Sequence, residues 1–393
     1  MGKRRRLAGG LIGAFALVVS TLAASITAGA SSGARTYTIG VDNVTPSQHN
    51  FEYVDYFPRG SVSDSDTPTV VGNGSIIDFH WQGTGDSLHT ATLLPSGMTP
   101  GQAWQDFPLV TVDSSDFVPG APGPPPLAAN NGVFFQNVSC GASAASACPY
   151  NGTQLINSGA RGTAGPPSSP DFYVQLNAPT NTPTTFHFVC LIHPGMQGAI
   201  TVVPGQGSSP SAVSDNAATQ YASDTLDASA AEAQASTTAA ATNTIIAGTA
   251  TSFVEVAEML PHNATVSTGD QLTWTTQSIK DPHTVTFPQG HGSDSVDPLQ
   301  PPICEAATGD VPLFFAGGAP CGNPANFEVP FDPGAHGGST ISSAVATSPV
   351  TSGIMANFPP FGNSVTFSFS QPGTYVYQCR IHDHMIGTIV VTG

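Results

Sequence analysis

Alternation between apolar and polar positions predicts strands in two stretches of the chain that resemble each other. Over residues 184–190 every second side chain packs on one face, and His187 and Val189 fall on the other. The stretches 374–379 and 388–391 alternate in the same way. A period of two is typical of half-buried strands, and the Pro-Gly and Thr-Gly pairs beside them indicate turns. We therefore expect many short strands rather than helices.

The chain contains one pattern twice. Residues 182–203 read TPTTFHFVCLIHPGMQGAITVV, and residues 371–391 read QPGTYVYQCRIHDHMIGTIVV. Further upstream, residues 74–82 read GSIIDFHWQ, and residues 269–277 read GDQLTWTTQ. Because the features keep the same order in both halves, the sequence predicts a tandem duplication of one domain.

This repeat predicts two domains, at 35–204 and 245–393, joined by a segment at 205–244. That segment is rich in Ala, Ser and Thr and nearly free of large apolar residues, which favours a linker. A short helix around 227–235 is compatible with its Ala and Glu content. The fold class predicted for the whole chain is all-β, with a Greek-key β-sandwich in each domain.

Composition supports this fold class. The 393 residues include 42 Gly and 35 Pro, and both residue types interrupt helices, which excludes long coiled coils and disfavours a helical bundle. Charged residues make up only 9% of the chain, and the net charge is −17. An acidic surface repels phosphate, so nucleic acid is excluded as a main partner, and a partner that is basic or neutral at the contact is favoured.

The first thirty residues have the pattern of an export signal. Lys3 to Arg6 form a basic start, 7–26 is mostly apolar, and Ala28 to Ala30 has the small-x-small form of a cleavage site. We predict a signal peptide at 1–30, with an uncleaved membrane anchor as the alternative. No later segment is apolar enough to span a membrane, so the mature chain is expected in the periplasm, outside the cell or at its surface.

A Cys-x2-His-x2-Met motif follows the strand in each copy. A thiolate, an imidazole and a thioether within seven residues can face one point from a single tight loop. A second imidazole comes from an earlier strand, and His80 is the rival to His89 for that role in the first copy. Two His, one Cys and a weak axial Met form the trigonal geometry of electron-transfer copper sites, whereas zinc would not select a thioether. The predicted ligands are His89, Cys190, His193 and Met196 in the first copy, and His283, Cys379, His382 and Met385 in the second.

The alternative for one copy alone is a buried Cys beside a His and a core-filling Met, and two copies with identical spacing argue against it. These segments resemble the cupredoxin family of small blue copper proteins. GTYVYQCRIHDHMIGTIVV is similar to the closing strand–loop–strand of plastocyanin-like proteins, and its short gap between His and Met is closest to amicyanins. The resemblance implies an eight-stranded sandwich with type 1 copper at one end, two coppers per chain, and electron ports at His193 and His382. The regions 100–165 and 290–350 depart from the family pattern as long loop insertions.

Four further cysteines lie in these insertions. Near pairs in an exported protein indicate disulfides, most simply Cys140 with Cys148 and Cys304 with Cys321, although the sequence also allows other pairings. A second metal site at these cysteines is the alternative. His291 and His336, in the second insertion, are candidates for a further metal ion.

Three functions fit these features. The first is one-electron transfer between Cu(II) and Cu(I), with a redox protein as partner and no catalysis. The second is an oxidase or nitrite reductase, but those enzymes usually place His directly beside the ligand Cys, and Cys190 and Cys379 have no such neighbour. The third is copper storage or delivery, which usually uses Met-rich or His-rich tracts, and this chain has 6 Met in total. Electron transfer is the function that the sequence favours.

Overall fold

The structure is a computed structural model. The residues it describes are 35–42, 44–45, 50–63, 66–82, 89–106, 109–111, 127–129, 136–161, 170–179, 181–289, 330–331, 338–346, 350–357, 361–379, 381–382 and 384–393. The predicted signal peptide therefore lies outside the described residues, as do Cys304, Cys321, His291 and His336. None of the helices in these ranges has both the length and the apolar character needed to cross a membrane.

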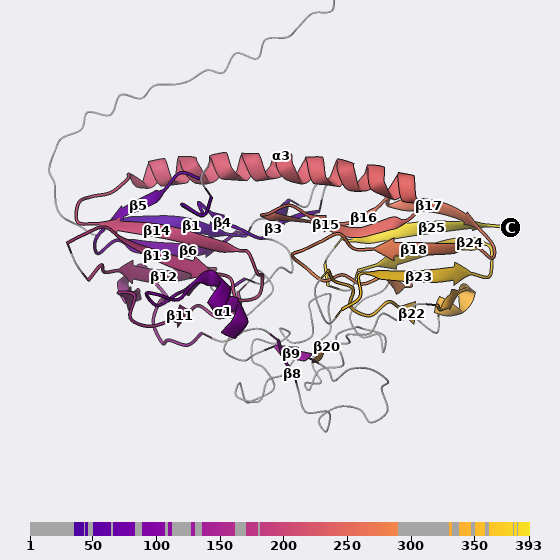
Figure 1. The fold of residues 1–393 in the computed structure, drawn as a ribbon, viewed down its shortest axis with the longest axis horizontal. Coiled ribbons are helices and arrows are strands. Elements are labelled where there is room, and N and C mark those ends of the chain that lie inside the picture. The colour runs from indigo at the N-terminus through magenta and orange to yellow at the C-terminus, as the bar shows by residue number, and fades with distance from the viewer. Residues whose placement is uncertain are drawn as a thin grey trace, which may run out of the picture. The chain divides into compact units, whose positions relative to one another are not determined.

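Two β-sandwiches make up most of the described chain, which we call lobe 1 and lobe 2 (Figure 1). The all-β prediction is confirmed. In lobe 1, one sheet contains, in spatial order, β10 (Cys148–Tyr150), β12 (Asp171–Leu176), β6 (Ile76–Trp81), β1 (Thr36–Val41) and β4 (Tyr56–Phe57). The other contains β11 (Ile156–Asn157), β7 (Thr92–Leu93), β13 (Thr184–Val189), β14 (Gln197–Val203) and β5 (Thr69–Gly72).

Lobe 2 has sheets with corresponding strand orders. One contains β2 (Val44–Thr45), β3 (Phe51–Tyr53), β16 (Val254–Leu260), β15 (Ile245–Ala250), β18 (Gln271–Thr275), β23 (Ser364–Phe369) and β21 (Thr340–Ile341). The other contains β17 (Asn263–Ser267), β25 (Ile386–Thr392), β24 (Gly373–Gln378), β19 (Thr286–Phe287) and β22 (Val350–Thr351). The run β12-β6-β1-β4 in lobe 1 thus has the same pairing pattern as β23-β18-β15-β16 in lobe 2.

Strands from the first half of the chain take part in the sheet of lobe 2. β3 pairs antiparallel with β16, which places Glu52 opposite Glu255. In the insertions, β8 (Leu109–Thr111) pairs with β9 (Leu127–Ala129), and β9 pairs with β20 (Pro330–Phe331) from the other insertion. The two halves of the chain are therefore joined by backbone hydrogen bonds as well as by side chains.

The alternation seen in the sequence positions the cores. Phe186 and Phe188 of β13 are buried in lobe 1, and His187 between them is exposed. Tyr375 and Tyr377 of β24 are buried in the same way in lobe 2. Each core then continues directly into the following cysteine, so burying the strand face also buries the metal-binding motif.

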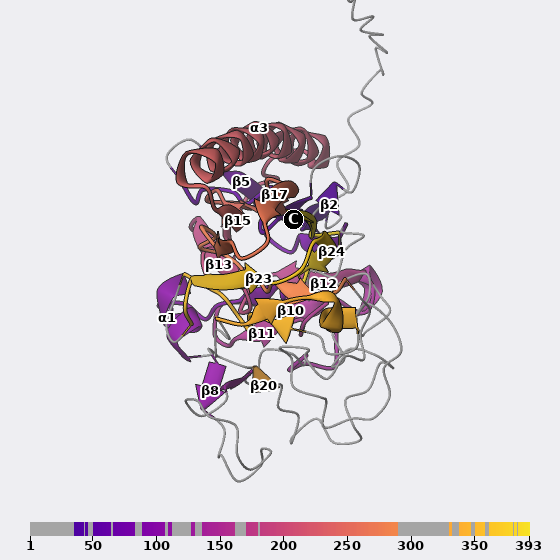
Figure 2. The ribbon, with the colours of Figure 1, turned by 90° about the vertical axis from the view of Figure 1, so that its right-hand side faces the viewer.

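The segment between the lobes is a single long helix and not the flexible linker with a short helix that its composition predicts. α3 (Pro210–Thr242) begins at Ser209, whose hydroxyl accepts from the Ala212 amide, and ends at Asn243 in the left-handed region. It lies along strands of both lobes (Figure 1), and Figure 2 shows it on the outside of the strand layers. Its buried side chains are few and mostly small: Val213, Asp224, Ala228, Ala235 and Ala239.

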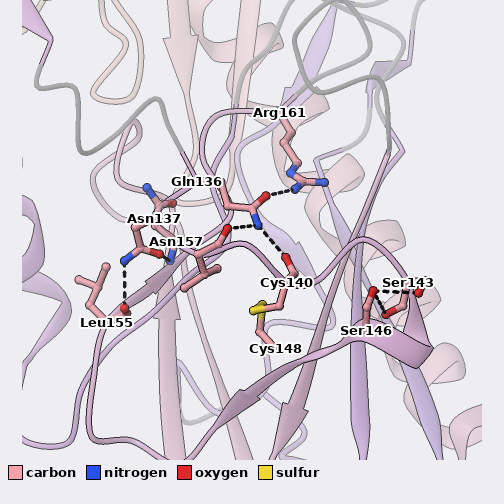
Figure 3. Close-up of a disulfide and its surroundings, with 10 residues drawn as sticks. Gln136, Asn137, Cys140, Ser143, Ser146, Cys148, Leu155, Asn157 and Arg161 are labelled. Atoms are coloured by element: carbon pink, nitrogen blue, oxygen red, sulfur yellow. Dashed lines mark hydrogen bonds between the residues drawn. A yellow bond between two sulfur atoms is a disulfide. The ribbon is translucent and has the colours of Figure 1, made fainter. Parts of the chain in front are cut away.

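A disulfide joins Cys140 to Cys148 at the edge of lobe 1, as the sequence predicts (Figure 3). Closing a loop of 8 residues stabilises the folded state by about 2.5 kcal/mol in the chain-entropy model. The Gln136 amide donates to the Cys140 carbonyl at 2.6 Å, and the Arg161 guanidinium donates to Gln136 at 2.9 Å. Hydrogen bonds therefore connect this edge to Arg161, whose backbone is in turn hydrogen-bonded to His89.

Candidate metal centre

A tight loop brings the motif residues of lobe 1 around one point. Cys190 directly follows β13, and Met196 directly precedes β14. The Cys190 amide donates to the Met196 carbonyl at 3.0 Å, and the Met196 amide donates to the His193 carbonyl at 3.1 Å. Since β13 and β14 are paired along their whole length, the ends of this loop are fixed in position.

Lobe 2 contains the same loop. Cys379 follows β24 and Met385 precedes β25, and the Cys379 amide donates to the Met385 carbonyl at 2.9 Å. Both methionines are fully buried in the core that contains the cysteine of their own lobe. The two loops thus place the same residue types in the same local arrangement.

The upstream histidines are held by short backbone bridges. His89 exchanges two backbone hydrogen bonds with Arg161, at 3.0 and 2.9 Å. His283 does the same with Met355, at 2.8 Å for both bonds. Both imidazoles are fully buried. These bridges explain how a histidine about a hundred positions away in the chain reaches the cysteine.

Among the described residues, three groups of three residues have donor atoms that all lie within 4.8 Å of one another, and two of these groups contain a motif cysteine. We call His89, Cys190 and His193 site one, and His283, Cys379 and His382 site two. In site one, Cys190 Sγ lies 3.5 Å from His193 Nδ1, and the two histidine Nδ1 atoms lie 3.0 Å apart. In site two, Cys379 Sγ lies 3.5 Å from His382 Nδ1. Backbone amides of Thr90 and Thr284 donate to the two sulfurs at 3.4 Å.

These donors fit a copper ion. The His283 Nδ1 atom is buried and has no hydrogen-bond partner among the described residues, which is costly unless a cation accepts its lone pair. Two imidazole nitrogens and one thiolate, with a buried thioether in the same loop, form a soft donor set that suits copper in both oxidation states. Zinc usually takes four firm N, O or S ligands and does not choose a thioether.

The electrostatics of both sites favour the thiolate form of cysteine. Burial alone raises the pKa of the Cys190 thiol, but the charge of His193 and hydrogen bonds from both histidines outweigh burial and hold that pKa well below its usual value. The pKa of Cys379 is lowered in the same way by His283 and His382, against the effect of burial. A thiolate is the form of cysteine that binds metals.

A buried carboxylate faces the outer nitrogen of each histidine. Burial lowers the pKa of His89, but Asp42 raises it to about 9, and Glu52 likewise outweighs burial to raise the pKa of His382 to about 10. The four pairs of Nε2 and carboxylate oxygen are His89 with Asp42 at 3.5 Å, His193 with Asp281 at 3.0 Å, His283 with Glu255 at 3.0 Å and His382 with Glu52 at 3.8 Å.

The two histidines that the family resemblance assigns as electron ports are buried and not exposed. His193 and His382 are each only 7% exposed, because their imidazole edges face Asp281 and Glu52, each of which comes from the other half of the chain. In each site, a carboxylate therefore occupies the edge that the resemblance assigns to a redox partner.

Other histidines singled out by the sequence lie elsewhere. His80 is in the middle of β6, and its Nδ1 is 2.6 Å from an Asp171 oxygen, away from site one. Cys140 and Cys148 are joined to each other, whereas Cys190 and Cys379 are the free cysteines of the described residues. The alternative of a metal site at the first pair of cysteines is therefore not supported.

The sequence reasoning missed the four carboxylates and one glycine. Gly248 has φ +79°, and a Cβ at this position would stand 2.0 Å from His283 Nε2, so only glycine leaves room for that imidazole. A signal for two of the carboxylates was present, because Glu52 and Glu255 interrupt apolar strands in a chain with few charges. Nothing local marked Asp42 or Asp281.

No family model matches the chain, and no curated protein matches it significantly. Solved structures of amicyanin do match. A reduced variant is 15% identical with a TM-score of 0.18, over 34% of this chain and 72% of that chain. A reduced Cu(I) variant at pH 4 is 17% identical with a TM-score of 0.19, over 38% of this chain and 81% of that chain. At TM-scores this far below 0.5, the function has to be inferred from the site's own residues.

Proposed function

We propose that this chain is an exported electron carrier of the cupredoxin type that arose by tandem duplication and binds two type 1 copper ions. The observation that supports it most directly is the pair of buried His–Cys–His clusters, each within 4.8 Å and each with a buried Met in the same loop. His89, Cys190, His193 and Met196 would hold one ion, and His283, Cys379, His382 and Met385 the other. Bound copper would supply one-electron transfer between Cu(II) and Cu(I).

The protein's own residues provide what such a carrier needs. Burial keeps water away from both cysteines, and paired strands fix both ends of each loop, so donor positions change little when charge changes. Backbone amides that donate to sulfur stabilise the thiolate. Among the described residues, no histidine stands beside either cysteine in sequence or forms a further all-histidine cluster, which favours a carrier over an oxidase or reductase.

Loading with Cu(II) tests this function. The purified protein should show intense thiolate-to-copper absorption in the visible range, which disappears on reduction and returns on reoxidation. A metal count should give two copper ions per chain. A protein that binds only zinc, or that binds copper without thiolate absorption, would contradict the electron-transfer function and leave copper storage or delivery as the better hypothesis.

Because His193 is covered, electrons need another route to site one. Trp104 of α1 (Pro100–Asp106) is half-buried, and its indole Nε1 donates to the Cys190 carbonyl at 2.8 Å. We expect Trp104→Phe, which keeps an aromatic ring but removes the donor, to slow reduction of site one several-fold with unchanged copper content. Stopped-flow reduction by a cationic ruthenium complex measures this rate.

The control for this prediction is site two. In a Cys379→Ser protein only site one is present, and in a Cys190→Ser protein only site two is present. Trp104→Phe should slow reduction of the Cys379→Ser protein and leave the reduction rate of the Cys190→Ser protein unchanged. If reduction of both proteins slows equally, or if neither slows, Trp104 is not part of the route.

The acidic net charge of −17 favours a redox partner that is basic or neutral where it contacts this surface.

A further inference from the structure

The four carboxylates that face the metal-binding histidines differ in which half of the chain supplies them. Asp42 and Glu255 belong to the same lobe as their histidines, whereas Asp281 of lobe 2 contacts His193 of site one. In the opposite sense, Glu52 comes from the first half of the chain and faces His382 of site two. Each site therefore has one carboxylate from its own half of the chain and one from the other half.

Asp281 is held rigidly. It is 4% exposed, and its amide donates to the Ser278 hydroxyl oxygen at 3.1 Å. The same hydroxyl oxygen accepts from the Lys280 amide at 3.0 Å, and the hydroxyl donates in a short hydrogen bond to Glu255. The carboxylate that faces site one is thus fixed by a turn that is itself bonded to the carboxylate of site two.

Glu52 is fixed by a different device. It lies on β3, which is paired in register with β16 of lobe 2, so Glu52 stands opposite Glu255. Its side chain is 5% exposed and lies within 4.8 Å of both Asp281 and His382, counted between donor atoms. The Asn50 amide just before β3 also donates to Glu258 of lobe 2 at 2.7 Å. Glu52 therefore cannot leave site two without breaking the shared sheet.

Several buried ionisable groups lie around these two sites. The four buried carboxylates each face one imidazole, and the buried cation Lys280 directly precedes Asp281 in the chain. Buried carboxylates are costly unless cations or donors compensate them. Imidazoles that bind a metal through Nδ1 keep a proton on Nε2 and so can donate to these carboxylates, an arrangement that orients the ring and strengthens the ligand.

We propose that Asp281 and Glu52 are positioning residues that act crosswise between the two halves of the chain: Asp281 of the second half orients and tunes His193 of site one, and Glu52 of the first half does the same for His382 of site two. This rests on the proposed copper function. It means that neither site is complete within its own half of the chain. It also means that the chain needs both halves for either site to have its native affinity and reduction potential.

The test uses single-site proteins, with Cys379→Ser retaining site one and Cys190→Ser retaining site two. Asp281→Asn should weaken Cu(II) binding at site one by about 10–100-fold, the usual effect of losing such a partner, and at site two by less than about threefold. Glu52→Gln should show the reverse pattern. The potential of the affected site should rise, since losing a negative charge disfavours Cu(II) more than Cu(I). Chelator competition and redox titration give both quantities.

Asp171→Asn is the matched control, because this carboxylate also pairs with a histidine, His80, but lies away from both sites. It should leave both affinities and both potentials unchanged. Asp281→Glu keeps the charge and should restore most of the affinity at site one, which a purely structural role would not predict. Near-ultraviolet circular dichroism shows whether Asp281→Asn folds. If it does not, Asp281→Glu alone provides the test: the absorption spectrum of site one should change, and that of site two should not.

Effects that are equal at both sites, confined to the site in the residue's own half of the chain, or absent would overturn the crosswise arrangement. Failure of the proposed function looks different. In that case the single-site parents themselves, with Asp281 and Glu52 intact, would lack the thiolate-to-copper absorption.

Discussion

Replacing Cys379 with serine is expected to lower bound copper from two ions per chain to one and to remove about half of the thiolate-to-copper absorption. Serine is not deprotonated near neutral pH, so the site loses both its charge and its soft donor. Cys190→Ser should have the same effect, and the double variant should bind no copper at these sites. Metal analysis and visible spectra of the copper-loaded proteins measure this directly.

The matched control is the double replacement of Cys140 and Cys148, which form the disulfide and lie outside both sites. That protein should keep two coppers and its full absorption, although it should unfold more easily. A wild-type protein with a single copper, or a Cys379→Ser protein that loses both, would mean that the two clusters do not act as separate sites.

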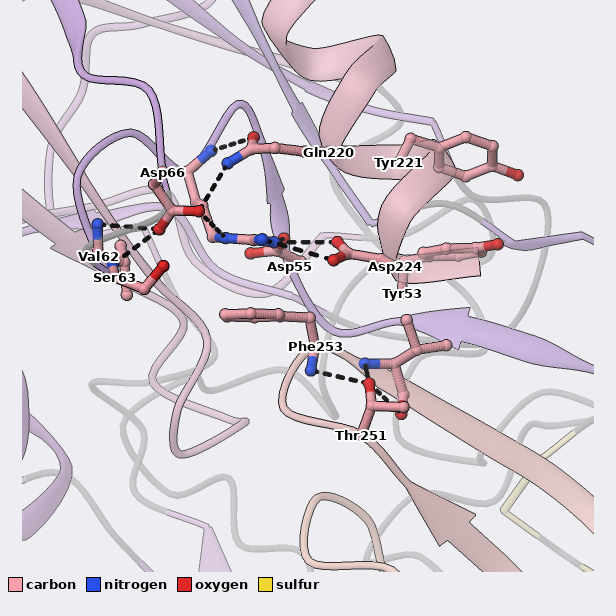
Figure 4. A network of polar contacts seen from close by, with 12 residues as sticks. Tyr53, Asp55, Val62, Ser63, Asp66, Gln220, Tyr221, Asp224, Thr251 and Phe253 are labelled. Carbon is pink, nitrogen blue, oxygen red and sulfur yellow. Dashed lines mark hydrogen bonds and ion pairs between the residues drawn. The ribbon is translucent and has the colours of Figure 1, made fainter. Parts of the chain in front are cut away.

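The second large effect concerns Arg59, whose side chain contacts residues of lobe 1, α3 and lobe 2; Figure 4 labels its partners Asp55, Asp66, Asp224 and Phe253. Its guanidinium pairs with Asp55, lies 2.9 Å from Asp224 of α3 and 3.1 Å from Asp66, and stacks 3.5 Å from the ring centre of Phe253. Arg59→Met should lower the free energy of unfolding of the metal-free protein by about 3–5 kcal/mol, because it leaves buried carboxylates without their cation. Denaturant unfolding measures this loss.

The loss should depend on pH. Burial raises the pKa of Asp55 well above its usual value, against the opposing effect of Arg59, and burial also raises that of Asp224. When folding raises the pKa of a carboxyl, the free energy of unfolding falls as pH rises above the pKa of that carboxyl in the unfolded state, which is about 3.9. Removing Arg59 raises both pKa values further, so the deficit should shrink as pH falls from 7 toward 5.

Asp66→Asn is the matched control. The backbone amides of Val62 and Ser63 donate hydrogen bonds to Asp66, and the side-chain oxygen of an asparagine can still accept both. Its loss of stability should stay near or below about 1 kcal/mol. A similar small loss for Arg59→Met, independent of pH, would show that this charge cluster does not hold α3 against the lobes.

The helix α3 shows where reading the sequence was insufficient. Its Ser and Thr residues have modest helix propensity, and the stripe it buries consists mainly of small residues such as Ala228, Ala235 and Ala239. Small side chains give little amphipathic signal, yet they allow the helix to approach the strands closely. The helix forms because tertiary contacts, including Asp224 with Arg59, add to a weak local preference.

The features that can be predicted from the sequence are local. The period of two fixed which strand faces are buried, and the spacing from Cys190 to Met196 required only one tight loop, so both the all-β class and the loop donors were readable. His89 was selected over His80 because the second copy has His283 at the matching place. These features depend on residues that are near in the chain or repeated along it, and such patterns are visible without coordinates.

The surroundings of the two sites depend on contacts between residues that are distant in the chain. Asp281 and His193 are far apart in the chain, and an aspartate before a proline normally indicates a solvated turn. Contact between the two halves of the chain buries His193 and His382 and places Asp281 and Glu52 against them. Long-range packing of this kind has no periodic signature in sequence, because each partner contributes one residue whose role exists only when the other half of the chain is in place.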